Sequence, residues 1–365
     1  MKIVMIANAL AVHTQRWAKA LHARGHEVTV ISSRHAEITG IRVLSRCVGP
    51  IDSGFPLWPL LTHIWLTLCL PFDLRRLKPD VVNAHYCTTH GVDAAIARAK
   101  PRVVNVWGSD LVEVGPDPTS WRKRQLIRFA LKDPSAIVST SRYMAEHVKA
   151  MVPDHPPIHV VPFGSDTSAF RPRQQATSPE SKQLRVGFLK TFSAKYAPEL
   201  LVEAASRIQR DDIAFVMAGD GPQLDATRML ARDKGLSTRF EFPGRLSHDN
   251  APAYLRTLDI FVNCSRVESF GVVICEASAT GLPVIVTDIG GVRETVREGE
   301  TGLLIPPDDP QALADAIRKL ADDADLRRQM GQAGRAFVQE HYEWGRCVDD
   351  FGNVLRIASE TRPRQ

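Results

Sequence analysis

The stretch LDIFVNCSRVESFGVVICEASATGLPVIVTD, residues 258–288, contains the pattern that decides the fold. Two short apolar runs, 259–263 and 283–287, flank a helical pattern over 270–280. A strand, a helix and a second strand in this order form one unit of a parallel sheet, because parallel neighbours need a crossover connection. Consecutive apolar residues form the centre of both runs, at 260–262 and 283–286, as in strands that are covered on both faces. The stretch therefore predicts an α/β domain.

The same alternation extends through the rest of the chain. It predicts two doubly wound parallel sheets, one in each half. In the first half we expect one helix over 13–24 and strands over 2–7, 27–32, 81–84, 102–107, 136–139 and 159–162. In the second half we expect further strands over 184–189, 213–218 and 239–242, helices over 198–208 and 224–234, and mostly helix after Gly302.

A change of composition separates the two halves. Residues 171–183, RPRQQATSPESKQ, include two prolines and no large apolar residue, which is typical of a linker. A chain of 365 residues also suits two domains of about 100–200 residues each. We expect a first domain over 1–170, a second over 171–343, and a helical segment over 344–365 that crosses back to the first domain. An active site would then lie in the cleft between the domains.

Charge and cysteine content narrow the class of protein. Through Asp166 the chain has 20 Lys and Arg against 13 Asp and Glu, and the remainder has 26 against 28. A basic first half suits an anionic partner, and it equally suits a solvated surface with scattered arginines. No nucleic-acid-binding motif accompanies the charge, so we expect no nucleic acid. Six cysteines without C-x-x-C spacing argue against a zinc site and a disulfide scaffold, and favour a reducing compartment.

Residues 60–70 bear on the location of the protein. They are mostly apolar, include Trp65, and are followed by Arg75, Arg76 and Lys78. Eleven residues are too few to cross a bilayer, which takes about 20 in a helix. The segment fits either a helix in the interface of an anionic membrane or a buried helix of the first domain. Because the first ten residues suit a strand better than a signal peptide, we expect a cytoplasmic protein with peripheral membrane contact.

The loop and helix inside residues 258–288 suggest a ligand site. Glu268 follows a strand at its carboxyl end, where open α/β sheets bind ligands. Ser269 is a candidate N-cap, so the amides of Phe270 and Gly271 would point outward and attract phosphate. Glu276 lies in an apolar part of the helix, where a carboxylate needs a partner such as the hydroxyl pair of a ribose. The alternative is that both glutamates are surface charges.

This stretch resembles the donor site of glycosyltransferase family 4, which has the GT-B fold. The resemblance rests on ESFG and EA with glutamates eight positions apart, on GLPVI at 281–285 and on DIGG at 288–291. Other segments agree in order, namely FGSD at 163–166, AGDGP at 218–222, FPGR at 242–245 and TGLL at 301–304. The resemblance implies two Rossmann-like domains that face each other across a cleft. It also places Gly219 in a glycine-rich turn and Arg245 near the base of a nucleotide-diphosphate sugar.

The family holds the donor diphosphate with a basic pair, and Lys190 and Lys195 have its spacing of five after the strand 184–189. Fixed ammonium groups stabilise the charge that grows on a leaving diphosphate without a metal. Arginine is common at the first of these positions, and a lysine can serve phosphate as a point charge. The alternative is two solvent-facing lysines. We expect no metal and no cofactor, a UDP- or GDP-sugar donor, and a glycan or lipid-linked acceptor.

The first half departs from the family where many members have an active-site histidine. This chain has Trp107 there, and Asp110 and His85 are the nearest polar candidates for contact with the sugar or acceptor. A lone histidine is more often structural, so both readings stay open. The resemblance implies transfer of a hexose-type sugar with retention, in which Glu268 orients the sugar and Glu276 holds the ribose.

Two other functions fit the same architecture. A nucleotide-sugar 2-epimerase would bind the same donor but need acid and base groups and no acceptor. A non-catalytic nucleotide-sugar-binding protein would bind the donor without releasing the nucleotide. A metal-dependent transferase of the GT-A class is disfavoured, because the D-x-D at 323–325 lies in a helical, charged region and not at the end of a strand.

Overall fold

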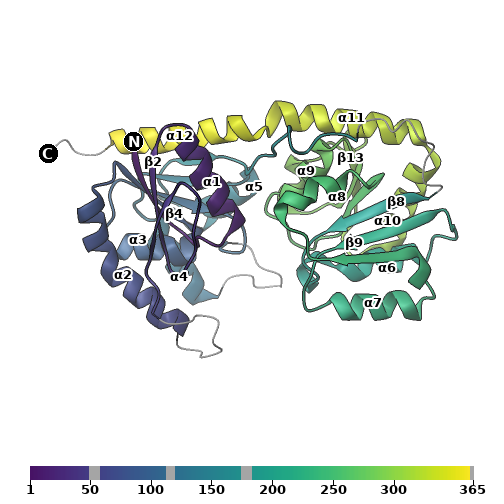
Figure 1. The fold of residues 1–365 in the computed structure, drawn as a ribbon, viewed down its shortest axis with the longest axis horizontal. Coiled ribbons are helices and arrows are strands. Elements are labelled where there is room, and N and C mark those ends of the chain that lie inside the picture. The colour runs from purple at the N-terminus through teal and green to yellow at the C-terminus, as the bar shows by residue number, and fades with distance from the viewer. Residues whose placement is uncertain (49–57, 112–119, 174–182, 362–365) are drawn as a thin grey trace. The chain divides into compact units, whose positions relative to one another are not determined.

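A computed structural model of the chain describes residues 1–48, 58–111, 120–173 and 183–361 (Figure 1). The chain forms two compact units. Unit 1 comprises Met1–Phe163 and Gly345–Gln365, and unit 2 comprises Gly164–Trp344. Most of the linker predicted at 171–183 lies outside the described residues. Each unit has its own parallel sheet and is described by itself.

Unit 1 is built on a seven-stranded parallel sheet in the order β3-β2-β1-β4-β5-β6-β7. Its strands are β1 (Lys2–Ile6), β2 (Glu27–Ser32), β3 (Arg42–Ser45), β4 (Val81–His85), β5 (Arg102–Val106), β6 (Ala136–Ser139) and β7 (Ile158–Val160). The connecting helices are α1 (Val12–Ala23), α2 (Trp58–Leu77), the π-helix η1 (Tyr86–Gly91), α3 (Val92–Ile96), α4 (Trp121–Leu131) and α5 (Arg142–Met151).

The last helix, α12 (Trp344–Glu360), packs in unit 1 although it follows unit 2 in the chain. Its apolar face is buried, and the ring of Phe351 lies 4.7 Å from that of Trp17 on α1. The helix therefore completes the core of unit 1.

Unit 2 has a six-stranded parallel sheet in the order β10-β9-β8-β11-β12-β13. Its strands are β8 (Leu184–Leu189), β9 (Ile213–Ala218), β10 (Phe240–Gly244), β11 (Ile260–Asn263), β12 (Val284–Thr287) and β13 (Gly302–Ile305). Its helices are α6 (Pro198–Ala205), α7 (Leu224–Asp233), α8 (Ala251–Leu255), α9 (Val272–Ala279), α10 (Pro310–Asp322) and α11 (Ala324–His341), with short turns η2 (Ala194–Tyr196), η3 (Ser237–Arg239), η4 (His248–Asn250) and η5 (Gly290–Glu294).

Two apolar layers cover the two faces of the sheet in unit 2. Phe215 and Met217 on β9 belong to a layer with α6 and α10, whereas Val216 and Ala218 belong to a layer with α8 and α9. This division follows from the alternation of side chains along a strand. Figure 1 shows helices on both faces of each sheet. The predicted doubly wound α/β fold is confirmed.

Two strands escaped the sequence prediction. β3 is a short edge strand whose residues are exposed or half-buried, so it lacks the apolar run of a central strand. β13 begins at Gly302, in a region that we expected to be helical. A Cβ atom at Gly302 would lie 2.5 Å from the carbonyl oxygen of Val284. Glycine is therefore required for β13 to pair closely with β12.

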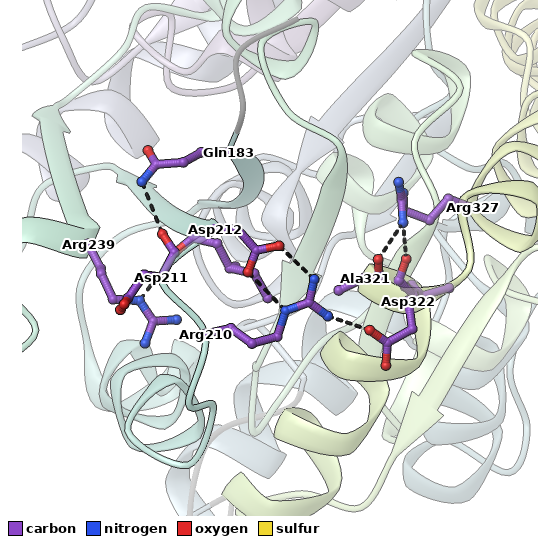
Figure 2. Close-up of polar contacts among 10 residues, drawn as sticks. Gln183, Arg210, Asp211, Asp212, Arg239, Ala321, Asp322 and Arg327 are labelled. Carbon is purple, nitrogen blue, oxygen red and sulfur yellow. Dashed lines mark hydrogen bonds and ion pairs between the residues drawn. The ribbon is translucent and has the colours of Figure 1, made fainter.

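Polar contacts fix the edge of the sheet in unit 2 where β8 and β9 begin (Figure 2). The guanidinium of Arg210 donates to both carboxylate oxygens of Asp212, at 2.9 and 2.7 Å, and also pairs with Asp322 at the end of α10. The side chain of Gln183 donates to the carbonyl oxygen of Asp211 at 3.1 Å. Exposed ion pairs add little to the free energy of unfolding. We infer that these contacts mainly hold the loops before β8 and β9 in place.

Candidate functional site

In unit 2, the strands β8 and β11 lie side by side at the centre of the sheet. The chain leaves β8 toward β9 on one side and continues from β11 toward β12 on the other. Such a reversal opens a crevice at the carboxyl ends of the two strands, where open α/β sheets bind ligands. Lys190 follows β8 directly, and Glu268 lies in the loop after β11. The topology therefore brings together two residues that are 78 positions apart in the sequence.

Lys190 and Glu268 form a partly buried ion pair. The Nζ atom of Lys190 donates to Oε2 of Glu268 at 2.5 Å, and the two side chains are 14% and 10% exposed. Burial is the largest single influence and lowers the pKa of Lys190. The negative charge of Glu268, its hydrogen bond and the nearby Tyr196 and Glu276 together outweigh burial, so the pKa lies above its ordinary value. The ammonium group is therefore charged at neutral pH. A fixed cation in a water-poor crevice is suited to stabilising negative charge on a ligand.

Lys195 extends this cationic region. The Nζ atoms of Lys190 and Lys195 lie 4.8 and 5.3 Å from the centre of the Tyr196 ring, so one aromatic ring supports both lysines. The two lysines that the sequence spacing singles out therefore flank a common side chain.

Arg266 holds the lysine loop in place, a role that the motif did not reveal. Its backbone N–H donates to the carbonyl oxygen of Lys195 at 2.8 Å, and its guanidinium donates to that of Ala194 at 2.7 Å. The same guanidinium pairs with Glu199 and Asp308, each at 2.7 Å. Arg266 therefore links the loop after β8 to the loop after β11.

The glycine-rich turn after β9 lies against the lysine loop. Gly219 has φ +143°, and a Cβ atom there would lie 1.9 Å from the carbonyl oxygen of Lys190. The backbone N–H of Lys190 donates to the carbonyl oxygen of Ala218 at 3.2 Å, and that of Phe192 to Asp220 at 2.9 Å. Only glycine permits both the conformation and the close approach. Gly219 therefore contributes to the site by positioning Lys190.

The start of α9 corrects one prediction. Helix α9 begins at Val272, and its N-cap is Gly271 with φ +97°, so the expected N-cap at Ser269 is wrong. The left-handed backbone conformation costs free energy for serine but not for glycine. Ser269 and Phe270 lie in the preceding loop, where the Phe270 ring is buried 5.2 Å from that of Tyr342. The helix start therefore lies two residues beyond the predicted position.

The DIGG segment supports the same loop from the other side. The N–H of Gly291 donates to the carbonyl oxygen of Glu268 at 3.2 Å. A Cβ atom at Gly291 would lie 2.0 Å from the carbonyl oxygen of Ser269. The second glycine of the segment therefore allows the backbone of the Glu268 loop to approach.

Glu276 lies on α9 and is 5% exposed. Its Oε1 atom is 3.8 Å from Nδ1 of His248, on the turn η4 after β10. None of the sequence motifs included His248, because its approach to Glu276 depends on packing between distant loops. Arg245 directly follows β10 and is exposed.

Unit 1 has a cavity at its own point of strand reversal, between β1 and β4. The cavity has a volume of about 400 Å³, and its wall includes Asn8, Thr14, His85, Tyr86 and Trp107. Asn8, Tyr86 and Trp107 follow the strands β1, β4 and β5, His85 ends β4, and Thr14 lies on α1. Trp107 lies 4.5 Å from the ring of His85, so the tryptophan forms part of the wall where many family members have a histidine.

His85 is buried in a chain of polar side chains. Its Nε2 atom lies 2.7 Å from Oδ1 of Asn83, whose amide donates to Oδ1 of Asn105 at 2.7 Å. Its Nδ1 atom lies 3.5 Å from the hydroxyl of Thr14. Burial, followed by the charges of His90 and His13, lowers the pKa of His85 to about 3. His85 is therefore neutral in the folded chain at neutral pH.

Asp110 is also buried, and its carboxylate binds backbone groups. It accepts the N–H groups of Cys87 at 3.1 Å, Trp107 at 3.1 Å and Gly108 at 2.8 Å. Burial raises the pKa of the Asp110 carboxyl above its ordinary value. These bonds join the loop after β5 to the π-helix η1 and fix the backbone of Trp107.

The π-helix is the most unusual backbone feature of this cavity. It starts at Tyr86, which has φ +73° although it is not glycine. Both π-turns and left-handed non-glycine residues are costly and occur preferentially at functional sites. The backbone strain at Tyr86 supports a functional role for the cavity.

The pKa of His85 predicts how stability depends on pH. Because the folded-state pKa is below that of the unfolded chain, the unfolded chain binds the extra proton as the pH falls through 6.5. Lowering the pH from about 7 to about 5 is expected to lower the free energy of unfolding by about 2 kcal/mol through His85. Urea unfolding of the wild type and of His85→Gln at both pH values measures this term. Equal pH dependence in the two proteins would contradict it.

Helix α2 presents an apolar stripe to the solvent. The segment predicted over 60–70 lies within this helix, which buries one face and exposes the other. Leu68 and Phe72 are 69% and 67% exposed. The exposed large apolar side chains of the helix are Leu60, Leu61, Ile64, Trp65, Leu68 and Phe72. Among the described residues, no helix combines the length and apolar character that a membrane crossing requires.

Comparisons with known sequences agree with the motifs. The model "Glycosyltransferase Family 4" matches residues 10–169, and "Glycosyl transferases group 1" matches residues 170–337. A GDP-mannose-dependent alpha-(1-6)-phosphatidylinositol monomannoside mannosyltransferase from Mycobacterium tuberculosis is 34% identical over 54% of this chain. The match spans 56% of the length of that relative. An N-acetyl-alpha-D-glucosaminyl L-malate synthase from Bacillus anthracis is 25% identical over 77% of this chain and 75% of its own.

Solved structures resemble the whole chain. A sucrose-phosphate synthase from Thermosynechococcus elongatus superimposes with a TM-score of 0.86 over 98% of both chains, at 22% sequence identity. At this identity the likeness concerns the fold, which is of the GT-B type with two Rossmann-like domains.

Proposed function

We propose that this chain, which belongs to the glycosyl transferases of group 1, transfers a hexose-type sugar from a nucleotide-diphosphate sugar to an acceptor. The observation that carries the proposal is the Lys190–Glu268 ion pair at the strand reversal of unit 2, with Lys195 beside it. A charged ammonium group there suits a leaving diphosphate, and a carboxylate suits sugar hydroxyls. We further propose that the configuration of the sugar is retained.

In this proposal unit 2 binds the donor. Lys190 and Lys195 neutralise the diphosphate, Glu268 orients the sugar hydroxyls, and Glu276 accepts hydrogen bonds from the ribose. The remaining donor contacts are assigned to the loop at the start of α9, to the glycine-rich turn and to the loop after β10: Ser269, Phe270, Gly271, Gly219 and Arg245. The name of the mannosyltransferase relative supports a GDP-sugar, and a UDP-sugar is the alternative.

The reaction needs no enzyme nucleophile. The bond between the anomeric carbon and the diphosphate oxygen breaks, and its electron pair stays on the diphosphate. The acceptor oxygen forms the new bond on the same face of the sugar, and its proton moves to the departing phosphate oxygen. The positive charge of the lysines lowers the barrier because it acts most strongly when the diphosphate charge is fully developed.

We assign acceptor binding to unit 1. Its cavity has a polar and aromatic wall that suits a glycan or the headgroup of a lipid-linked acceptor. His85 in this wall is proposed to contact the acceptor or the transferred sugar, and Asp110 to act beside it by fixing Trp107. In this assignment residues 1–170 form the acceptor domain, residues 171–343 the donor domain, and residues 344–365 return to the first. The products would belong to cell-surface polysaccharide or glycolipid synthesis.

Calorimetry with UDP, GDP, ADP and their common sugars, each with and without EDTA, tests the donor assignment. We expect binding to one nucleotide that EDTA does not change and that the double variant Lys190→Ala/Lys195→Ala abolishes. Sugar transfer is then measured with the matching donor and candidate acceptors. Conversion of the nucleotide-sugar alone to an epimer would replace the transferase proposal with an epimerase. Binding without turnover would favour a non-catalytic protein.

We also propose that the apolar stripe of α2 contacts the inner face of an anionic membrane from the cytoplasm. The stripe lies on one helix face, and the exposed Arg75, Arg76 and Lys78 follow at its end. An exposed apolar helix face beside cationic residues suits the interface of an anionic bilayer. Such a contact would bring unit 1 close to a lipid-linked acceptor.

The double variant Leu68→Glu/Phe72→Glu is expected to lower binding to vesicles that contain phosphatidylglycerol by at least about tenfold. Co-sedimentation measures the binding, with phosphatidylcholine vesicles as the uncharged comparison. Met229→Glu on α7 is a matched control, because Met229 is 59% exposed outside the stripe. Unchanged binding of the double variant, or no binding by the wild type, would contradict the membrane contact.

A further inference from the structure

A cluster of two histidines and one aspartate lies in the wall of the unit 1 cavity. His63 and His90 both line the cavity, and Asp93 lies beside them. One ligand atom from each of the three residues can be chosen so that all lie within 4.8 Å of one another. His63 comes from α2, His90 from the π-helix η1 and Asp93 from the first turn of α3. Three segments of chain thus converge on one point.

The distances from Asp93 to the two histidines are long for hydrogen bonds and suit metal ligands. The Oδ2 atom of Asp93 lies 3.4 Å from Nδ1 of His63 and 3.3 Å from Nδ1 of His90. Hydrogen bonds from imidazole to carboxylate are usually about 2.7–3.2 Å long. Around a tetrahedral zinc ion with bonds of about 2.0–2.1 Å, neighbouring ligand atoms lie about 3.3 Å apart. Both distances to Asp93 match this spacing, and the ligand atoms of the two histidines lie within 4.8 Å of each other.

A hydroxyl group positions the carboxylate. The Oγ1 atom of Thr67, one helical turn after His63 on α2, lies 2.9 Å from Oδ1 of Asp93 and 2.8 Å from the carbonyl oxygen of His63, and its one proton is shared between these two acceptors. Oδ2 is thereby left to face the two histidines. Metal-binding carboxylates are commonly oriented by such a bond, which also raises the affinity for the metal.

The burial of the three side chains, and the access that solvent has to them, also suit a metal site with an open coordination position. The side chains of His90 and Asp93 are each 7% exposed, whereas that of His63 is 36% exposed. A cation could therefore enter along His63 and be held by the two buried ligands. Three protein ligands leave one coordination position of a tetrahedral ion free, and His63 and His90 both line the cavity.

We propose that His63, His90 and Asp93 bind a divalent transition-metal ion, of which Zn²⁺ is the probe. Imidazole and carboxylate ligands suit Zn²⁺, Co²⁺ and Ni²⁺. The free position would take water or an oxygen atom of a molecule in the cavity. This site is distinct from the lysine pair of unit 2, whose proposed chemistry uses no metal. Cysteine spacing could not reveal it, because all three ligands are histidine or aspartate.

The test uses the full chain, without a histidine tag, after dialysis against a chelator. Calorimetric titration with Zn²⁺ is expected to show one ion per chain. His90→Gln and Asp93→Asn are each expected to weaken binding by at least about 100-fold, because they remove a ligand, and Thr67→Val by about 10–100-fold. His147→Gln on α5 is the matched control and is expected to bind like the wild type. Circular dichroism checks that each variant folds.

Co²⁺ then identifies the ligands by its absorption spectrum. We expect the visible bands of a four-coordinate ion with nitrogen and oxygen ligands, lost in Asp93→Asn. A thiolate-to-cobalt band, a wild type that binds no ion, or full affinity in both ligand variants would overturn the proposal. Thr67→Val keeps all three ligands, so it tests the site even if a ligand variant fails to fold. Lys190→Ala is expected to keep Zn²⁺ binding, because the two proposed sites share no residue. A result that contradicts the zinc site would therefore leave the donor proposal unaffected.

Discussion

Replacing Lys190 with alanine is expected to lower kcat for sugar transfer by about 100- to 1000-fold. The loss has two physical causes. The leaving diphosphate loses a fixed positive charge, and Glu268 loses the ammonium group that lies 2.5 Å from its carboxylate. A carboxylate left with less compensation in a partly buried site also repels the diphosphate. Steady-state kinetics with the donor identified by calorimetry measures the effect.

Two further variants separate charge from structure. Lys319→Ala removes an exposed lysine on α10 in the same unit and is expected to keep the wild-type kcat. Lys190→Arg keeps the charge and is expected to recover part of the lost activity, because arginine also binds phosphate. If Lys190→Ala turned over at a rate close to that of the wild type, the role of Lys190 in catalysis would be wrong.

Gly219→Ala is expected to destabilise unit 2 by about 2 kcal/mol or more and to weaken donor binding in the same variant. The new Cβ atom would lie 1.9 Å from the carbonyl oxygen of Lys190, which is backbone and cannot rotate away. The lysine loop would therefore move, and Lys190 with it. Urea unfolding gives the stability, and calorimetry of the folded variant gives the affinity.

Gly235→Ala is the matched control for this glycine. Gly235 also has a positive φ, +72°, but a Cβ atom there meets nothing within 4 Å. Only the conformational cost of about 1–2 kcal/mol should appear, without loss of donor affinity. Equal effects of the two substitutions on donor binding would show that close approach to Lys190 is unimportant.

Much of unit 2 could be predicted from the sequence because its elements carry local signals. The strands β9, β11 and β12 are almost entirely apolar, and β8 is mostly apolar with Arg185 near its start. The prediction placed each strand within one residue of its observed bounds. The spacing of Lys190 and Lys195 after β8 was equally local. Their approach to Glu268 followed from the topology, since neighbouring parallel strands end at the same edge.

What escaped prediction depends on contacts between distant segments. Arg266 and His248 act through loops that only the packed fold brings together. The N-cap of α9 was misplaced because the left-handed conformation at Gly271 is set by packing of the surrounding loop, where Ser269 looks like an ordinary cap. His63 and His90 are 27 positions apart, without a spacing that marks ligands. These cases share one cause: patterns in a single sequence report on residues that are close along the chain, whereas these contacts join residues that are distant in sequence.

The return of α12 to unit 1 has a consequence for the order in which the protein is made. A ribosome synthesises residues 1–163 before unit 2, but the core of unit 1 lacks Phe351 and its neighbours until α12 has also been synthesised. At about 5–20 residues per second, the 188 residues between Phe163 and Phe351 take roughly 10 to 40 seconds. Unit 2 is contiguous and can fold during this interval. Of the two units, the one that starts first in the sequence is therefore completed second.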